Sequence, residues 1–119
     1  MGIALVALKT GEQILSNVEI DENAGTVYCN RPLRIGWVRP DKKLTRILMQ
    51  LSIFPPMISG VAQNLSGHAV TYRATDVLCI LHESELKPEA VEQYRRESGE
   101  IYSGIEIMSG MPQELKGEA

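Results

Sequence analysis

Runs of apolar residues along the chain predict mainly β-strands. Residues 3–8 are apolar at every position, which is typical of a strand that is buried on both faces. Residues 13–20 and 26–30 instead alternate between apolar and polar positions, as expected for strands with one buried face. Polar, Gly-containing segments separate these runs at residues 9–12 and 21–25. The pattern therefore predicts a meander of three antiparallel strands.

The third predicted strand continues beyond a proline. Apolar residues keep the same-face spacing from Leu33 to Trp37, past Pro32, so we expect a long strand that bends where the proline interrupts its ladder. Alternation returns at residues 46–53 and ends at a Pro-Pro pair, which indicates a fourth strand. Bent strands of this kind are what a small barrel requires.

Two short apolar runs and one helical segment complete the predicted elements. Residues 69–72 and 77–81 are typical of strands, and the four residues between them, 73–76, are typical of a tight polar turn. Helical spacing follows at residues 86–98, where Pro88 suits the first turn and a Ser-Gly pair ends the pattern. We therefore expect a short C-terminal helix after the strands.

Length and composition fit a single domain. A chain of 119 residues with 44% apolar composition can bury one ordinary core but not two. We expect this domain, with its helix, to span residues 1–105, and the polar residues 106–119 to form a flexible tail. The chain has no long apolar run and no basic-then-apolar leader, so we expect a cytoplasmic protein that does not bind a membrane.

Charge is distributed unevenly along the chain. Residues 1–81 carry eight Lys or Arg and six Asp or Glu, whereas residues 82–119 carry four and nine. Half of all basic residues lie between positions 31 and 46, where Asp41 is the single acidic residue, and they are predicted phosphate contacts: Arg31, Arg34, Arg39, Lys42, Lys43 and Arg46. The alternative is that this run forms a solvated loop with no ligand.

Motifs for catalysis, metal binding or cofactor binding are not found in the sequence. There is no Gly-x-Gly-x-x-Gly segment and no phosphate loop. His68 and His82 have no third ligand at metal spacing and no nearby nucleophile motif. Cys29 and Cys79 lie in apolar runs, which favours buried free thiols over a disulfide. We therefore expect a protein that is not an enzyme and that holds no metal or cofactor.

Two strand-turn segments resemble the signature segments of the Sm-like (LSm, Hfq-like) family of RNA-binding proteins. Val6-Ala7-Leu8-Lys9-Thr10-Gly11 is similar to the first, which reads hydrophobic, any residue, Leu, Lys, polar, Gly before an alternating strand. Tyr72-Arg73-Ala74-Thr75-Asp76-Val77 is similar to the second, a hydrophobic-Arg-Gly-Asn turn before an apolar last strand. Ala74 replaces the Gly of that turn, and Glu22 stands at the family's Asp position. The chain looks most like a divergent viral, for example phage, or bacterial member.

The resemblance implies a fold and an assembly. It implies a small, strongly bent, five-stranded antiparallel barrel, in which residues 40–67 would form an enlarged loop between strands 3 and 4. The short C-terminal helix predicted above would follow this barrel. The resemblance also implies that the outer strands pair between subunits to close a homo-oligomeric ring. The residues point the same way, because the apolar runs 3–8 and 77–81 need cover on two faces, which neighbouring subunits can provide.

The resemblance further implies that single-stranded RNA or DNA, more readily RNA, binds where the turns line a central pore. Such a ring would act in RNA or DNA processing. The residues that the resemblance places at the pore are Arg73, Tyr72, Thr75, Asp76, Asp21, Glu22 and Asn23. A guanidinium such as that of Arg73 can stack on a base and donate to its edge. Two alternatives stay open: Arg73 closes its own turn through Asp76, or the ring is a structural scaffold with no nucleic-acid role.

Overall fold

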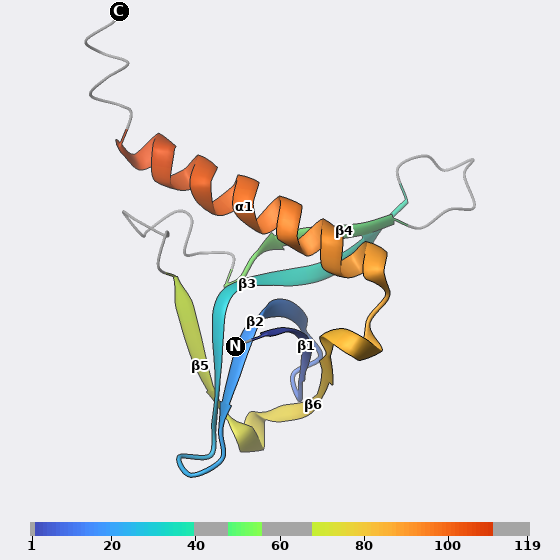
Figure 1. The fold of residues 1–119 in the computed structure, drawn as a ribbon, viewed down its shortest axis with the longest axis vertical. Helices are drawn as coiled ribbons and strands as arrows, with labels where there is room; N and C mark the ends of the chain where they lie inside the picture. The colour runs from blue at the N-terminus through green and yellow to red at the C-terminus, as the bar shows by residue number, and fades with distance from the viewer. Residues whose placement is uncertain (1, 40–47, 56–67, 111–119) are drawn as a thin grey trace, which may run out of the picture.

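The computed structural model describes residues 2–39, 48–55 and 68–110, which form a mainly β fold with one helix (Figure 1). The strands are β1 (Gly2–Leu8), β2 (Gln13–Asp21), β3 (Thr26–Val38), β4 (Leu48–Ile53), β5 (Ala69–Arg73) and β6 (Val77–His82). Short 3-10 turns, η2 (Ala74–Asp76) and η3 (Glu83–Glu85), follow β5 and β6, and helix α1 spans Pro88–Gly110. The described part of each predicted apolar run thus forms a strand, as expected.

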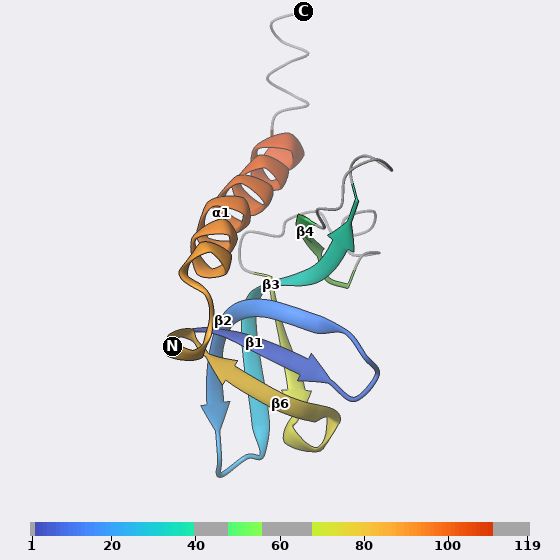
Figure 2. The same ribbon diagram turned by 90° about the vertical axis from the view of Figure 1, so that its right-hand side faces the viewer.

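The six strands form one antiparallel sheet in the order β4-β3-β2-β1-β6, with β5 paired to β3 beside this path. Strand β3 is long enough for two partners, since residues 26–30 pair with β5 and residues 33–38 pair with β4. Figure 2 shows how strongly β1, β2 and β6 curve across one another. In the described residues no ladder joins β6 to β4 or β5, so the sheet is not closed.

The five-stranded barrel predicted above is therefore not confirmed, because the sheet is open and has six strands. The sixth strand comes from the predicted enlarged loop at residues 40–67. Strand β4 lies within this predicted loop. It pairs with residues 33–38 of β3 to form a hairpin, the β3–β4 arm, from the pair Leu33 and Ile53 to the pair Val38 and Leu48. The rest of the predicted loop, residues 40–47 and 56–67, lies outside the described residues.

Strand β3 bends where Pro32 interrupts it, as predicted. The register between β2 and β3 shifts by one residue at this point, and Arg31 has a left-handed φ of 54°. Side-chain hydroxyls supply the hydrogen bonds that the irregular backbone needs. Ser16 donates to the Asn30 oxygen across 2.7 Å, and two tyrosines of α1 donate to the oxygens of Arg31 and Pro32, each across 2.8 Å.

The bent sheet has an apolar cluster on each face. The inner cluster consists of Ala4, Val6, Leu8, Ile14, Val18, Val27 and Cys29. The outer cluster lies under α1 and consists of Ile3, Leu15, Leu33, Leu51, Val91, Tyr94 and Tyr102. Because successive residues of a strand point to opposite faces, β1 contributes to both clusters, which explains its unbroken apolar run. Strand β6 differs, since Leu78 is 69% exposed at the edge of the sheet.

Helix α1 is longer than predicted. The expected end at residues 98–99 is wrong, because the helix continues to Gly110. The Ser98 hydroxyl is buried and donates to the backbone oxygen of Arg95 inside the helix, across 3.3 Å. One turn later, Tyr102 is fully buried in the outer cluster. The predicted tail, 106–119, thus begins within the helix, and its last nine residues lie outside the described part of the chain.

The two cysteines are free, as expected, but only one is buried. Cys29 lies in the inner cluster, where burial raises the pKa of its thiol to about 11. Cys79 is exposed, so its predicted burial is wrong. An apolar run at the edge of an open sheet has the same sequence pattern as a buried strand. In the described residues, no helix is long and apolar enough to cross a membrane.

Candidate nucleic-acid interface

Turn η2, between β5 and β6, lies between two other turns of the molecule. The backbone N–H of Lys9, in the β1–β2 turn, donates to the Asp76 oxygen across 3.0 Å. The N–H of Ala74 donates to the oxygen of Gly25, in the β2–β3 turn, across 2.8 Å. Main-chain hydrogen bonds therefore bring together η2 and the β2–β3 turn, which carry predicted nucleic-acid ligands, and the β1–β2 turn.

Local sequence explains the shape of the β1–β2 and β2–β3 turns. Gly11 and Gly25 have positive φ values of 108° and 67°, which residues with a side chain rarely adopt. In the β2–β3 turn, an Asp21 carboxylate oxygen accepts from the N–H of Ala24 across 3.0 Å. This bond holds one of the predicted nucleic-acid ligands in the turn itself, while its neighbours Glu22 and Asn23 are exposed.

Arg73 precedes η2 and has a highly exposed side chain. Its Nε atom lies 3.6 Å from the Asp76 carboxylate, and the two side chains are 82% and 57% exposed. The ion pair expected if Arg73 closes its own turn through Asp76 is thus present. Ion pairs between exposed groups contribute about 0–1 kcal/mol, so Asp76 orients the guanidinium of Arg73 without fixing it. Thr75, between them, is also exposed.

Tyr72 does not share this surface with Arg73, because neighbouring residues of β5 point to opposite faces. Its side chain is partly buried against the inner cluster, and its hydroxyl is buried with no hydrogen-bond partner in the described residues. Burial, with smaller contributions from Cys29 and Glu12, raises the pKa of this hydroxyl to about 12. The structure therefore separates two residues that the sequence placed in one site.

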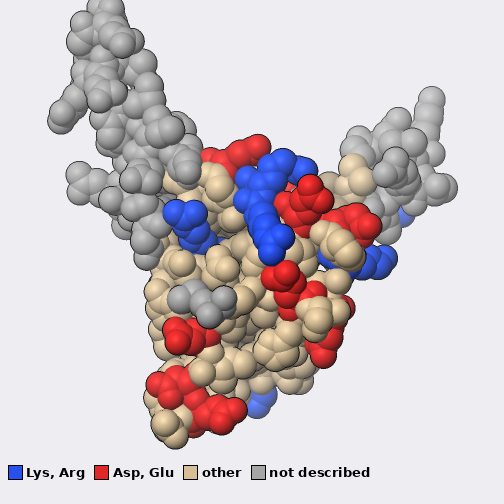
Figure 3. All heavy atoms as spheres, in the orientation of Figure 1, with Lys and Arg blue, Asp and Glu red and all other residues tan. Residues whose placement is uncertain are grey.

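The surface beside the β2–β3 turn is acidic. Its lining residues are Glu19, Ile20, Asp21, Glu22, Asn23, Thr26, Tyr28 and Thr71, which include three carboxylates and no Lys or Arg. In Figure 3, acidic side chains cover the lower tip of the molecule, where this turn lies. Carboxylates repel phosphate, so this part of the predicted site does not suit backbone contacts to nucleic acid.

Among the described residues, the predicted phosphate contacts do not gather around η2 and the β2–β3 turn. Arg31 is partly buried at the bend of β3, with its guanidinium carbon 5.8 Å from the ring centre of Tyr102. Arg34 is exposed on the β3–β4 arm, and Arg39 is exposed just beyond the end of β3. The other three predicted contacts, Lys42, Lys43 and Arg46, lie outside the described residues.

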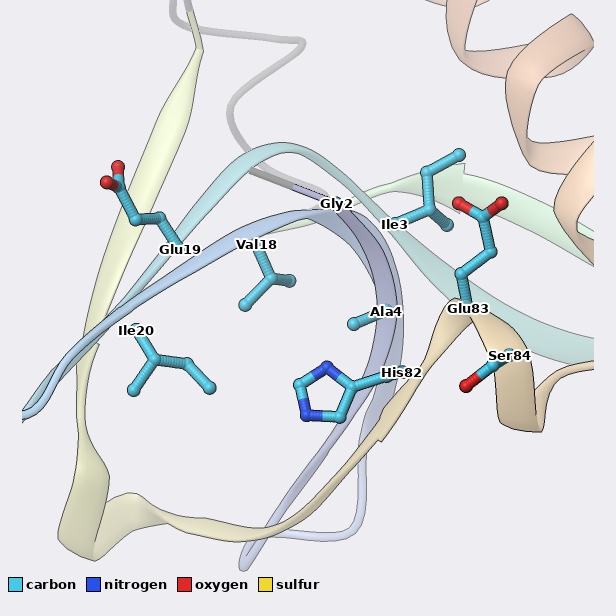
Figure 4. A pocket seen from close by; sticks show the side chains of 9 residues that line it. All are labelled: Gly2, Ile3, Ala4, Val18, Glu19, Ile20, His82, Glu83 and Ser84. Atoms are coloured by element: carbon cyan, nitrogen blue, oxygen red, sulfur yellow. The ribbon is translucent and has the colours of Figure 1, made fainter.

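A hollow of about 450 Å³ opens at one end of the inner cluster (Figure 4). It is lined by Gly2, Ile3, Ala4, Val18, Glu19, Ile20, His82, Glu83 and Ser84. Figure 4 shows Val18, Ile20 and Ala4 pointing into it beside the imidazole of His82. The hollow could accept an apolar group next to a hydrogen-bonding ring. Sequence reasoning missed it, because its residues come from β1, β2, β6 and η3, which are far apart in the sequence.

No group of three or more metal-binding side chains was found among the described residues.

Comparison with known protein families finds no matching family model, and no curated protein matches the chain. The resemblance to Sm-like proteins therefore stays a prediction that rests on residues 6–11 and 72–77.

Proposed function

We propose that this chain is a non-enzymatic subunit of a homo-oligomeric ring that binds single-stranded nucleic acid, RNA in preference to DNA. The observation that carries the proposal is the junction of η2 with the β1–β2 and β2–β3 turns, through the bonds from Lys9 to Asp76 and from Ala74 to Gly25. This junction leaves the guanidinium of Arg73 exposed beside the two turns.

At this junction we expect contacts to bases more than to phosphates. The guanidinium of Arg73 can stack on a base and donate to its edge. The carboxylates of Asp21 and Glu22 disfavour phosphate, but a carboxylate can accept a hydrogen bond from a base amino group. Thr75 of η2 and Asn23 of the β2–β3 turn are exposed and add a hydroxyl and an amide group. Unstacked bases of single strands offer such edges, whereas a duplex hides most of them.

The ring part of the proposal rests on the free edges of the sheet. Strand β6 pairs only with β1 and β5 pairs only with β3 among the described strands, so each leaves an outer edge without a partner. Leu78 and Leu81 on β6 are 69% and 39% exposed. An unpaired apolar edge is a template for another strand, and pairing of β5 with β6 of a second copy would repeat around a closed ring.

The ring is tested by the mass of the protein in solution, measured by light scattering with and without a short RNA oligonucleotide. We expect a mass of several subunits in both samples and a further increase that matches bound RNA. A monomer of 13.2 kDa would overturn the ring. A ring that binds no oligonucleotide at low salt, where phosphate contacts are strongest, would overturn the nucleic-acid role.

The second candidate is a structural ring with no nucleic-acid role. It is favoured by the charge of the β2–β3 turn, where Glu19, Asp21 and Glu22 gather without a Lys or Arg in the same lining. If several copies placed these carboxylates around one pore, they would repel a nucleic-acid backbone. The two candidates differ in a single observable result, which is oligonucleotide binding by the assembled ring.

A further inference from the structure

Trp37, the one tryptophan of the chain, lies near the end of the β3–β4 arm with 64% of its surface exposed. Its neighbour in the ladder is Met49 of β4, whose side chain is partly buried. Helix α1 holds the arm at this point, because Gln93 donates to the Met49 oxygen across 3.0 Å. The indole is therefore carried by an anchored strand, yet α1 leaves most of it uncovered.

Trp37 lines a hollow of about 470 Å³ between the arm and the β1–β2 turn. The arm contributes Arg34, Ile35 and Trp37, and the turn contributes Thr10, Gly11, Glu12 and Gln13. Gly11 leaves space in this wall, since a β-carbon added there would meet nothing within 4 Å. Arg34, Ile35 and Trp37 thus line the same hollow, although Arg34 lies on the opposite face of β3 from Ile35 and Trp37.

Charge favours an anionic ligand in this hollow more than in the lining beside the β2–β3 turn. Arg34 is exposed in the lining, and Arg39 is exposed two residues beyond Trp37. Glu12 is the single carboxylate of the lining, and it accepts a hydrogen bond from the Thr10 hydroxyl. That bond and the nearby positive charge of Arg34 lower the pKa of the Glu12 carboxyl. In this lining one acid is therefore opposed by one cation, whereas the lining beside the β2–β3 turn has three carboxylates and no Lys or Arg.

We propose that this hollow is a second contact site for single-stranded nucleic acid, in which a base stacks on Trp37 and the adjoining phosphate lies against Arg34. Proteins that bind single strands combine aromatic platforms with cationic side chains in this way. Arg39 would receive the next phosphate along the strand. The inference rests on the proposed function for its class of ligand, but it places the stacking platform at Trp37 on the arm, beside the β1–β2 turn, and not at Arg73.

The indole of Trp37 also provides the test, because it is the one tryptophan that can fluoresce. Oligo-uridine of about ten nucleotides, within the usual span of a single-strand site, is titrated into the full-length protein while tryptophan emission and fluorescence anisotropy of a labelled strand are followed. We expect emission to be quenched with the same midpoint as the anisotropy change. Trp37→Ala should weaken binding at least about fivefold, as loss of one stacking platform does, and Trp37→Phe should retain most of the affinity.

The outcomes separate this inference from the proposed function. If RNA binds but emission stays constant and Trp37→Ala binds as the wild type does, the stacking site is wrong while the function at Arg73 stands. If no strand binds at low salt, both are wrong. Emission that changes with protein concentration, and not with RNA, would assign the hollow to contact with a second copy and overturn the inference. Circular dichroism of Trp37→Ala and Trp37→Phe shows whether each variant is folded.

Discussion

Ala74 donates its backbone N–H to the backbone oxygen of Gly25 across 2.8 Å, and this bond joins two turns that are far apart in the sequence. It depends on the shape of the β2–β3 turn, in which Gly25 has a φ of 67°. The position of η2, and with it the exposure of Arg73, therefore depends on a glycine that the fold uses for its conformation.

Gly25→Ala is expected to lower the free energy of unfolding by about 1–2 kcal/mol, since a β-carbon is strained in left-handed backbone. Gly99→Ala is the matched control. Gly99 lies inside α1, and an added β-carbon would meet nothing within 4 Å. There alanine should raise the free energy of unfolding by about 0.5–1 kcal/mol. Urea denaturation measures both, and equal effects of the two variants would contradict the account of the turn.

The tyrosines of α1 are expected to stabilise the bend of β3. Tyr94→Phe and Tyr102→Phe each remove a hydroxyl that donates to a backbone oxygen, that of Arg31 or Pro32. Each should lower the free energy of unfolding by about 1–3 kcal/mol, because a buried acceptor loses its partner. Urea denaturation again provides the measurement. A change below about 0.5 kcal/mol in both variants would show that the bend does not need these bonds.

Tyr72→Phe should behave in the opposite way. Its hydroxyl is buried without a partner in the described residues, so removing it should leave the free energy of unfolding unchanged or raise it by up to about 1 kcal/mol. The comparison with Tyr94→Phe is direct, because both variants lose the same oxygen from a tyrosine of the core. A loss of stability as large as that of Tyr94→Phe would mean that the Tyr72 hydroxyl has a hydrogen-bond partner.

Stability is expected to fall in alkaline solution. Burial raises the pKa of Cys29 from 9.0 to about 11 and that of Tyr94 from 10.0 to about 12. Between these values the unfolded chain has released a proton that the folded chain keeps, so each group favours unfolding as pH rises, by up to about 1.4 kcal/mol per pH unit. Cys29→Val should flatten the decrease between pH 9 and pH 11 in urea denaturation. An unchanged slope would contradict the burial of the thiol.

The thiols should differ in reactivity. At neutral pH and low protein concentration, a thiol reagent should modify Cys79, which is exposed, and leave Cys29 unmodified until the protein unfolds. Since Cys79 lies on the free edge of β6, its reaction should slow as the concentration rises and rings form. Cys79→Ser serves as the control, because it should show no rapid reaction. A rate that is independent of concentration would count against pairing through β6.

Much of the fold could be predicted from the sequence because strands with one or two buried faces have distinct apolar spacing. The runs at residues 3–8 and 13–20 and the bend at Pro32 are examples. The end of α1 could not be predicted. A Ser-Gly pair is a common stop signal, but the buried contacts of Tyr102 continue the helix beyond it. Such tertiary contacts leave no local pattern.

The candidate site was predictable only in part. The resemblance of residues 72–77 to a known family singled out η2 and the β2–β3 turn as candidate site turns. In the structure, the hydrogen bond from Ala74 to Gly25 joins these two turns. The separation of Tyr72 from Arg73 follows from strand alternation, which a motif read along the sequence ignores. The hollow beside Trp37 depends on how the arm lies against the β1–β2 turn, so no sequence pattern indicated it.

The most direct test of the account is the affinity for a short RNA oligonucleotide at low salt, measured in parallel for the wild type, Arg73→Ala and Arg95→Ala. Arg95 is the matched control, since it is also an exposed arginine in an ion pair, with Glu83 across 3.2 Å, but it lies on α1. We expect Arg73→Ala to bind at least about tenfold more weakly, as loss of a base contact of about 1–3 kcal/mol does, and Arg95→Ala to bind nearly as the wild type. Equal affinities of the two variants would contradict the role of Arg73.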